Sequence, residues 1–506
     1  MSLLGLDLGT THCKGALFAE DGALLHAVSV PTPACSLPGG HTEYDPEELW
    51  SAATKLMREL AEVSAGGPPD VIGVAGMAES GCLVDVRSGR PRSNILAWFD
   101  TRSRPQAERL AASPGSETLF GRTGLNPSFK HGLAKLLWLR DRVGTSPSES
   151  LWLSVPDWIV LRLTGRMVTD PTLAVRTLAF NIGRGEWDAD TLAEVKLSRT
   201  TFPEVIPSGT PAGGLIPDAA AVVRLPVGVP VAVCGHDHIC ALLAAGVVEP
   251  GPVLDSMGTA ESLIGVLDEL RVDRLAADSG LSIVPHVLPN RFCWLGGISA
   301  SGGSVEWLRA QIGLAGSYDD MLDLLGDAEP DPTGILYFPY LAGSGAPNPD
   351  QDVRAALVGL AAEDTGSRLL KAVIEGTCFE AETIRRAGEQ LTGRPHSDLI
   401  AVGGGAKNHV WLQIKADVTG CACRAPELPE ATALGAALTA GLGAGLLRDL
   451  EAVQSIAGAA ARVGSTFSPD VGRHHTYRRL LEEDYLRLQA PLRAYVRRAT
   501  HAPGSG

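Results

Sequence analysis

The stretch SLLGLDLGTTHCKGALFAEDGALLHAVSV at residues 2–30 decides the fold. Apolar residues alternate on both sides of a Gly-Thr turn, and Asp21-Gly22 is a hairpin signal. The pattern predicts strands joined by tight turns. A similar phrase, PVLDSMGTAESLIGVL, recurs at residues 252–267, where another strand that contains an aspartate runs into Gly258-Thr259. This repeat predicts two duplicated domains.

We expect the boundary between the two domains within residues 245–252, at the turn signal Glu249-Pro250-Gly251-Pro252. The predicted domains are residues 1–246 and 247–506. Helices and strands alternate on both sides of the boundary, which indicates an α/β fold rather than an all-α or all-β one. Helices are expected at residues 46–63, 368–391, 432–442 and 473–498, and strands at residues 71–75, 229–234 and 399–402.

Composition excludes several classes of protein. The chain has 506 residues, 45% of them hydrophobic and 20% charged, which is ordinary for a globular protein. The net charge of −15 repels phosphate backbones and anionic lipids, so neither nucleic acid nor a membrane is an expected partner. Nine scattered cysteines do not form a disulfide framework, and we expect a reducing, cytoplasmic location. The first residues lack a secretory pattern, and no long apolar segment predicts a transmembrane helix.

The sequence Asp7-Leu8-Gly9-Thr10-Thr11, followed by Lys14, is suited to phosphate. A turn with glycine and two hydroxyl residues exposes backbone N–H groups to an anion. Lys14 supplies a cation for developing charge, and Asp7 can hold a hydrated magnesium ion. The alternative is an ordinary hairpin turn, because the motif is short.

The segment Cys234-Gly235-His236-Asp237-His238 joins an apolar strand to a helix of small residues. Asp237 therefore lies at the carboxyl end of a strand, where open α/β sheets carry reactive groups. Three interpretations stay open: a catalytic carboxylate, the N-cap of the helix, and a metal site formed with His236 and His238.

Other motifs are weaker individually. Glycine-rich turns that could face a nucleotide follow apolar segments, but none fits the P-loop or Rossmann patterns. Glu79, Trp98 and Asp100 suit a sugar pocket, because sugar hydroxyls need acceptors and the C–H face of a sugar packs on an aromatic ring. A solvated turn and a core tryptophan are the alternatives. The glycine-rich turns are Ser256-Met257-Gly258-Thr259, Gly296-Gly297, Gly302-Gly303 and Gly403-Gly404-Gly405.

Together these segments resemble the FGGY carbohydrate kinases of the actin-like ATPase superfamily. The resemblance extends over nearly the whole chain, in the family's order. It rests on DLGTTHCK, HTEYDPEELW, WFDTR with KLLWL, PDWIVLRLTG, GHDHICALLAAGV, PYLAGSGAPNPDQDVRAALVGL, and GGGAKNHVWLQIKADVTG with ALGAALTAGLG. It implies two actin-like (ribonuclease-H-like) α/β domains with the active site in the cleft between them.

The resemblance also implies roles for single residues. Asp237 matches the family's general base, and Asp7 is expected to position Mg²⁺ through water. Glu79, Trp98 and Asp100 are the expected substrate-binding residues; Glu79 falls where glycerol-kinase-like members carry Glu and xylulokinase-like members carry His. The residues expected at ATP and its phosphates are Thr10, Thr11, Lys14, Gly258, Thr259, Gly302, Glu306, Gly405 and Asn408.

Some segments depart from the family pattern. Gly343-Ser344-Gly345-Ala346-Pro347 stands where Gly-Glu-Arg-Thr-Pro is usual, Arg368 replaces an acidic, amide or His residue, and the loop at 126–132 is longer. These changes affect the expected sugar specificity. The phrases around Asp237 and at residues 255–261 resemble the L-fuculokinase-like branch most, with the xylulokinase-like branch close behind.

The expected reaction is transfer of the γ-phosphate of ATP, with Mg²⁺, to a primary hydroxyl of a ketose such as L-fuculose or D-xylulose. A glycerol-, erythritol- or gluconate-like substrate is the alternative. The rival functions are a non-sugar actin-like ATPase, such as a heat-shock chaperone, and a sugar-sensing regulator without catalysis. The sequence leaves open which sugar and which hydroxyl react, and whether the chain forms a homodimer.

Overall fold

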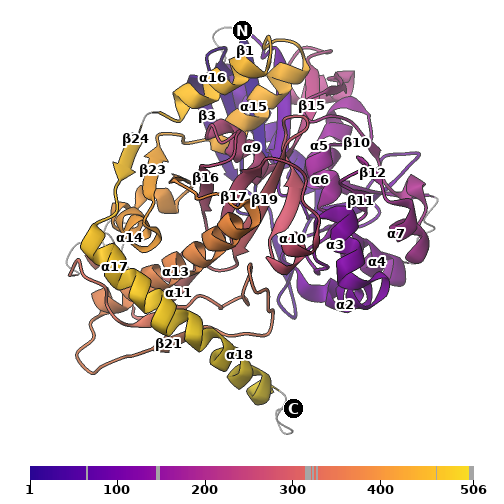
Figure 1. The fold of residues 1–506 in the computed structure, drawn as a ribbon. Coiled ribbons are helices and arrows are strands. Elements are labelled where there is room, and N and C mark those ends of the chain that lie inside the picture. Colours follow the sequence, from indigo (N-terminus) through magenta and orange to yellow (C-terminus); the bar gives the residue numbers. More distant parts are fainter. Residues whose placement is uncertain are drawn as a thin grey trace.

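The computed structural model describes residues 1–63, 67–143, 149–313, 321, 324–325, 329–462 and 464–500. Two large mixed sheets organise the chain, one in each half (Figure 1). The first sheet has the order β14-β15-β6-β1-β2-β3. Its strands are β1 (Ser2–Leu8), β2 (His12–Ala19), β3 (Leu24–Pro31), β6 (Val71–Gly76), β14 (Pro211–Gly214) and β15 (Pro230–His236).

The second sheet has the order β18-β19-β17-β16-β22-β23-β24. Its strands are β16 (Val253–Met257), β17 (Glu261–Leu267), β18 (Ser282–Pro285), β19 (Phe292–Ile298), β22 (Asp398–Val402), β23 (Ala422–Pro426) and β24 (Gly464–Phe467). The predicted repeat is present at the level of pairing: β1 is antiparallel to β2 and parallel to β6, while β16 is antiparallel to β17 and parallel to β22. The two phrases that the sequence singled out are thus the central hairpins of the two sheets.

Smaller sheets lie in the first half of the chain and in the segment before α13. A five-stranded sheet contains β4 (Cys35–Leu37), β5 (His41–Tyr44), β7 (Gly81–Asp85), β8 (Ile95–Leu96) and β9 (Ser150–Ser154). The two-stranded pairs are β10 (Val168–Thr169) with β13 (Glu204–Val205), β11 (Phe180–Asn181) with β12 (Glu186–Trp187), and β20 (Leu336–Phe338) with β21 (Ala356–Val358).

Helices cover the sheets. Those before β16 are α1 (Pro46–Val63), α2 (Arg104–Leu110), α3 (Ser116–Thr123), α4 (Gly132–Val143), α5 (Val155–Thr164), α6 (Pro171–Val175), α7 (Ala189–Glu194), α8 (Pro217–Val223) and α9 (Asp237–Ala244). Those after it are α10 (Arg274–Asp278), α11 (Gly302–Gln311), α13 (Gly366–Thr392), α14 (His409–Thr419), α15 (Ala431–Gly443), α16 (Leu450–Ala460), α17 (Val471–Arg479) and α18 (Leu486–Thr500). Among the described residues, every helix is too short or too polar to span a lipid bilayer.

Helix α15 belongs to the second half of the sequence but packs on the first sheet, against β1, β6 and α9 (Figure 1). The approach is close because small residues meet the helix backbone. A Cβ atom at Gly5 would lie 1.9 Å from the Ala433 carbonyl oxygen, and one at Gly73 would lie 2.3 Å from that of Ala436. A boundary at residue 246 therefore separates the strands of the two sheets, whereas α15 crosses back. This packing brings Glu430, the residue before α15, to Lys14 in the first hairpin.

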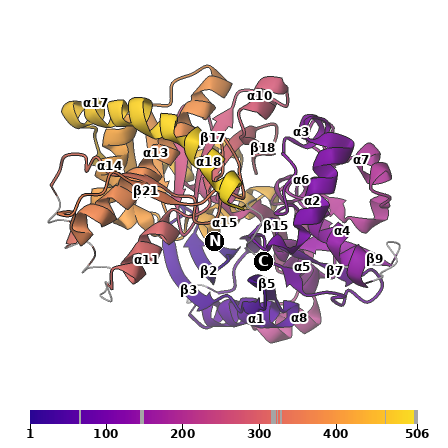
Figure 2. The same ribbon diagram turned by 90° about the horizontal axis from the view of Figure 1, so that it is seen from below.

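The opposite face of the first sheet is covered by α1 and α5. The α1 helix begins where the sequence predicted, because Asp45 Oδ1 accepts the N–H groups of Glu47 at 2.7 Å and Glu48 at 3.3 Å. On the second sheet, α13 and α14 share one face. Figure 2 shows α13, α14 and α17 on one side of the molecule and α4, α5 and α7 on the other.

The predicted carboxyl-terminal helix at residues 473–498 is present as α17, α18 and the helical turn that joins them. Between α17 and α18, Leu480–Tyr485 forms a wider turn. Tyr485 is thereby buried: its ring stacks on Phe338 at 4.4 Å between centroids, and its hydroxyl donates to Glu380 at 2.9 Å. A polar partner inside the domain thus sets the helix geometry here, which residue periodicity does not reveal.

Candidate active site

Three carboxylates gather at one edge of the first sheet. Strands β1, β6 and β15 are parallel neighbours, so their carboxyl ends meet. Asp7 lies near the end of β1, Glu79 follows β6, and Asp237 follows β15. This edge of an open α/β sheet is where reactive groups are usually placed.

The local backbone aims Asp237 into the site. The β15 register shifts between Val233 and Gly235, and Gly235 has a φ of +110°. A side chain at Gly235 would clash with Thr172, whose hydroxyl accepts the N–H of His236 at 2.9 Å. The predicted N-cap role moves by one residue: His236 holds the cap position, and Asp237 is the first residue of α9.

Asp237, whose side chain is 22% exposed, has two nitrogen atoms close to one carboxyl oxygen. Its Oδ1 accepts the N–H of His238 at 2.7 Å and lies 3.2 Å from His236 Nε2. Burial, and then the charge of Glu79, raise the pKa of Asp237 to about 7, against the lowering effect of the His238 N–H group and of Arg176. A carboxyl whose pKa lies near neutrality is suited to accepting and releasing a proton.

His236, Asp237 and His238 also satisfy the spacing of a metal site. One ligand atom from each lies within 4.8 Å of the others. Burial lowers the pKa of His238 to about 4, and that of His236 well below its usual value, so both imidazoles are neutral. The metal interpretation of this segment thus stays chemically open beside that of a base.

Asp7 and Lys14 face each other across the first hairpin, where they are register partners. Lys14 Nζ lies 3.3 Å from Glu430, the residue before α15. Burial, then the charge of Asp237, and to a smaller extent Glu430, raise the pKa of Asp7 to about 8, while Lys14 opposes them. Asp7 Oδ1 is buried and has no hydrogen-bond partner in the described parts of the chain.

Two further carboxylates, Asp237 and Glu430, and the Lys14 ammonium thus lie near Asp7. Together with the unpartnered Asp7 Oδ1, this set fits a hydrated divalent cation, because Mg²⁺ prefers oxygen ligands and keeps several waters.

Glu79 is held by an arginine that the sequence analysis did not single out. Arg176, which follows α6, donates from Nε and Nη2 to Glu79 Oε1, and both side chains are 8% exposed. Although burial alone would raise it, the Arg176 guanidinium holds the pKa of Glu79 well below its usual range. Arg176 Nη1 is buried without a partner among the described residues. Glu79 is therefore an ionised acceptor fixed by a cation, rather than a solvated turn residue.

Trp98 and Asp100 have different roles in the structure. Trp98 donates from Nε1 to the Thr10 hydroxyl at 2.9 Å, and Lys130 Nζ lies 5.2 Å from its ring centroid. The ring thus contacts the turn that follows β1 on one side and Lys130 on the other. Asp100, the third residue predicted to bind substrate, is engaged by neighbouring groups. Its two oxygens accept four hydrogen bonds, three from Arg102 and one from the Thr42 N–H, which fills the acceptor sites of a carboxylate.

The predicted nucleotide turns of the second half converge. The exposed turn Gly258-Thr259 contacts the start of α11: the N–H of Gly302 donates to the Gly258 carbonyl at 3.1 Å. A Cβ atom at Gly302 would lie 2.6 Å from that oxygen, so glycine is required there. A Cβ atom at Gly405 would lie 2.9 Å from the Cβ of Met257, which places the third turn beside the first.

Two further predicted residues are placed less directly. Glu306 is an exposed residue of α11 that pairs with Arg309. The Asn408 side chain is fully buried, and its Oδ1 caps α14 by accepting the Trp411 N–H at 3.0 Å. Asn408 thus orders the turn that would face the nucleotide. Thr11 and Thr259 are exposed at their turns.

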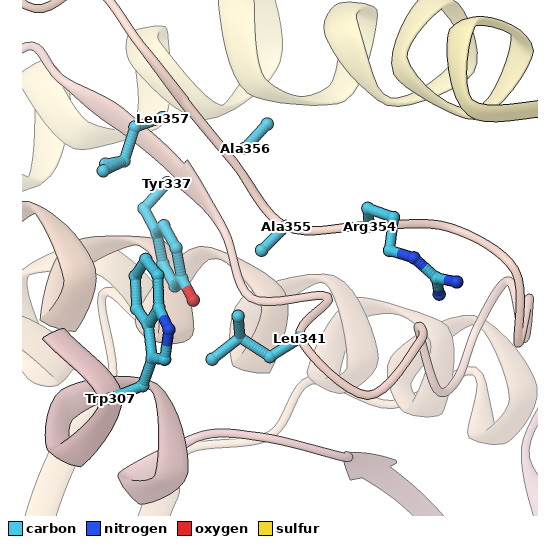
Figure 3. A pocket seen from close by; sticks show the side chains of 7 residues that line it. All are labelled: Trp307, Tyr337, Leu341, Arg354, Ala355, Ala356 and Leu357. Carbon is cyan, nitrogen blue, oxygen red and sulfur yellow. The ribbon is translucent and has the colours of Figure 1, made fainter. Parts of the chain in front are cut away.

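A pocket of about 260 Å³ lies apart from these groups, beside α11. Figure 3 shows Trp307, Tyr337 and Leu341 close together, with the Arg354 side chain extending away from them. Its lining contains none of the residues predicted for the site.

Comparison with known proteins decides the family. The model of the FGGY family of carbohydrate kinases, N-terminal domain, matches residues 2–244, and that of the C-terminal domain matches residues 256–444. The chain belongs to the FGGY family of carbohydrate kinases. It is accordingly an ATP-dependent kinase, as the resemblance of its motifs predicted.

Relatives of this kinase include two kinds of enzyme. It is 30% identical over 457 residues to the glycerol kinase of Citrifermentans bemidjiense, a match covering 88% of this chain and 90% of the relative. It is 28% identical over 456 residues to the xylulose kinase of Bacillus subtilis, with 89% of each chain covered.

Solved structures bear out the predicted two-domain actin-like fold. The xylulose kinase from Rhodospirillum rubrum superposes with a TM-score of 0.86 at 26% identity, over 98% of this chain and 100% of that one. The gluconate kinase from Lactobacillus acidophilus shares the fold, with a TM-score of 0.88 at 21% identity over 98% and 99%.

Sequence reasoning missed Arg176, Lys130 and Glu430. Each is an isolated charge in an unremarkable local pattern, and its role depends on a partner far away in the sequence. The Arg176–Glu79 pair spans 97 residues, for example. Only Glu430 had a local signal, because Pro429-Glu430 directly before the alanine-rich helix indicates a turn.

Proposed function

We propose that this carbohydrate kinase transfers the γ-phosphate of ATP to a primary hydroxyl of a ketose. The observation that carries the proposal is the Asp237 carboxyl at the end of β15, which has a pKa near 7 and lies close enough to Asp7 to raise the pKa of that residue. A base of this kind accepts a proton from a hydroxyl as that hydroxyl attacks phosphorus.

In this mechanism the chain positions the reactants and stabilises charge. Asp237 Oδ takes the proton of the sugar hydroxyl. Lys14, oriented by its contact with Glu430 at 3.3 Å, donates to the transferring phosphoryl group. Asp7 would hold the magnesium ion through water, and the ion, when bound, neutralises phosphate charge.

The exposed turns supply the remaining contacts with the nucleotide. Thr10 and Thr11 follow β1, and Gly258 and Thr259 follow β16, so hydroxyl and N–H groups from both sheets face the phosphates in this model. Gly302 and Gly405 allow close approach of the backbone, and Glu306 lies one helical turn further along α11. Phosphoryl transfer depends chiefly on such positioning.

The sugar would lie between Glu79, Trp98 and Asp237. Glu79 accepts hydroxyl donors, Arg176 keeps it ionised, and the Trp98 ring packs on the C–H face of the sugar. Glycerol or another polyol is the second candidate, favoured by the similarity to glycerol kinases. The proposal places the enzyme in the cytoplasm, in keeping with its nine unpaired cysteines.

A coupled ADP-release screen with Mg·ATP over ketoses, aldoses and polyols tests this proposal. We expect a ketose such as L-fuculose or D-xylulose to give the highest kcat/KM. Faster turnover of glycerol than of every ketose would overturn the ketose assignment and leave the kinase intact. ATP turnover that no sugar or polyol stimulates would favour the non-sugar ATPase, and sugar binding without product would favour the regulator.

The pH dependence of the best substrate gives a second test. Asp237 must be unprotonated to act as a base, so kcat/KM should fall as the pH drops below about 7, its raised pKa. Asp7 contributes to the same limb, because two interacting carboxyls titrate as a pair. Initial rates at low substrate from about pH 5 to 9 measure this limb; a flat profile would contradict the assignment.

A further inference from the structure

A fully buried ammonium lies beneath the predicted nucleotide turns. Lys415 Nζ, on α14, contacts Asp255 Oδ2 of β16 and lies 2.8 Å from Glu261 Oε1 of β17. The side chains of all three residues are 0% exposed. Taking charges out of water is costly, so a cluster of this kind needs a reason beyond filling space.

The cluster joins the two sides of the second phosphate turn. Asp255 precedes Gly258-Thr259 and Glu261 follows it, on antiparallel strands whose register pairs Met257 with Glu261. Asp255 and Glu261 therefore project from the same face of the hairpin, the face that α14 covers. Lys415 thus holds the two ends of the turn against one helix.

The same cluster reaches the other two turns. Ser301, the residue before α11, donates from its hydroxyl to Glu261 Oε2 at 2.6 Å. Its N–H donates to the Thr259 carbonyl at 3.0 Å, so the start of α11 is tied to the turn twice. Lys415 itself lies on the helix that Asn408 caps, directly after the Gly405 turn. One ammonium is therefore connected to all three converging turns.

We propose that Lys415 is the positioning residue of the nucleotide site, and that its ion pairs with Asp255 and Glu261 hold the three turns in the arrangement that binds Mg·ATP. The inference rests on the proposed nucleotide-binding role of these turns. It predicts that the charges of the cluster matter for nucleotide affinity separately from their contribution to folding.

The three charges of the cluster interact with one another, so they should be neutralised together. Burial and then the neighbouring Glu261 raise the pKa of Asp255, while Lys415 opposes them. Replacing Lys415 alone leaves two buried carboxylates without a counter-charge, which is strongly destabilising, whereas neutralising a whole buried cluster is often tolerated. The informative variant therefore carries Asp255→Asn, Glu261→Gln and Lys415→Met together.

The experiment measures Mg·ADP affinity by calorimetry and stability by urea unfolding, without any sugar. We expect the triple variant to unfold near the wild-type urea concentration and to bind Mg·ADP at least about ten-fold more weakly, the effect of losing one good charged hydrogen bond. A folded triple variant with wild-type affinity would overturn the proposal. If the wild-type protein does not bind Mg·ADP, the nucleotide site itself is misplaced, which is a different failure.

Two further variants complete the design. Ser301→Ala removes only the bond between α11 and Glu261, and it should weaken Mg·ADP binding in a protein that folds normally. If the triple variant does not fold, wild-type affinity in Ser301→Ala overturns the proposal. The control neutralises Glu382 and Arg385, which lie 2.7 Å apart and are buried members of an ion-pair network on α13 that also includes Arg386 and Glu389. Glu382→Gln/Arg385→Met should leave Mg·ADP affinity unchanged.

Discussion

Replacing Asp237 by asparagine is expected to lower kcat by about 10²- to 10⁴-fold, the range typical for loss of a general base. The amide keeps the shape of the carboxylate and can still accept the His238 N–H bond of 2.7 Å, so α9 should begin as before. It cannot accept a proton from the sugar hydroxyl. Because Asp237 is not among the residues predicted to contact ATP, Mg·ADP affinity should be unchanged.

The control for this variant is Asp218→Asn, an exposed carboxylate in the first turn of α8. It changes the net charge by the same amount and should retain wild-type kinetics. A single-turnover measurement of phosphorylated product in both variants separates chemistry from product release. An Asp237→Asn enzyme with half the wild-type kcat would show that another group takes the proton.

Much of the fold follows from local signals. The residues 2–30 give three consecutive antiparallel strands, β1 to β3, because alternation, the Gly-Thr turn and the Asp21-Gly22 turn need no distant partner. Asp237 was placed at a strand end for the same reason: an apolar run stops at Cys234-Gly235, and a helix of small residues follows. The predicted duplication was also visible, because the same strand-turn pattern recurs at residues 252–267 and forms the equivalent pairs.

What the sequence could not provide is the pairing of distant charges. Asp100 is of a residue type that binds sugar hydroxyls, yet its carboxylate oxygens accept hydrogen bonds from Arg102 and from the Thr42 N–H. Lys415 lies in a helix between the apolar residues Ile414 and Ala416. Its partners, Asp255 and Glu261, are 160 and 154 residues away in the sequence. The docking of α15 on the first sheet depends on glycines in other strands. Such contacts depend on tertiary packing, which one sequence does not specify.

The ion pair between Glu79 and Arg176 leads to the second large effect. Arg176→Met leaves an ionised carboxylate buried without its counter-charge, which should lower the free energy of unfolding by about 3–5 kcal/mol. Glu79→Gln leaves the guanidinium unpaired and should cost a similar amount. Urea unfolding measures both, and the exposed pair of Glu62 and Arg224 supplies the matched control, since Glu62→Gln should change the unfolding curve little.

The double variant Glu79→Gln/Arg176→Met separates folding from specificity. With no unpaired charge left, most of the lost stability should return, while kcat/KM for the best sugar should stay lower by more than about 2 kcal/mol, or roughly 30-fold, the range of a charged hydrogen bond. A site that binds a hydroxyl through a charged acceptor loses much of its kcat/KM for the sugar when that acceptor is removed. ATP hydrolysis without sugar should barely change, because Glu79 contacts no nucleotide in the proposed arrangement. If the double variant recovers both stability and kcat/KM, the pair serves only to hold α6 against the first sheet, and the sugar must be recognised by other groups around Asp237.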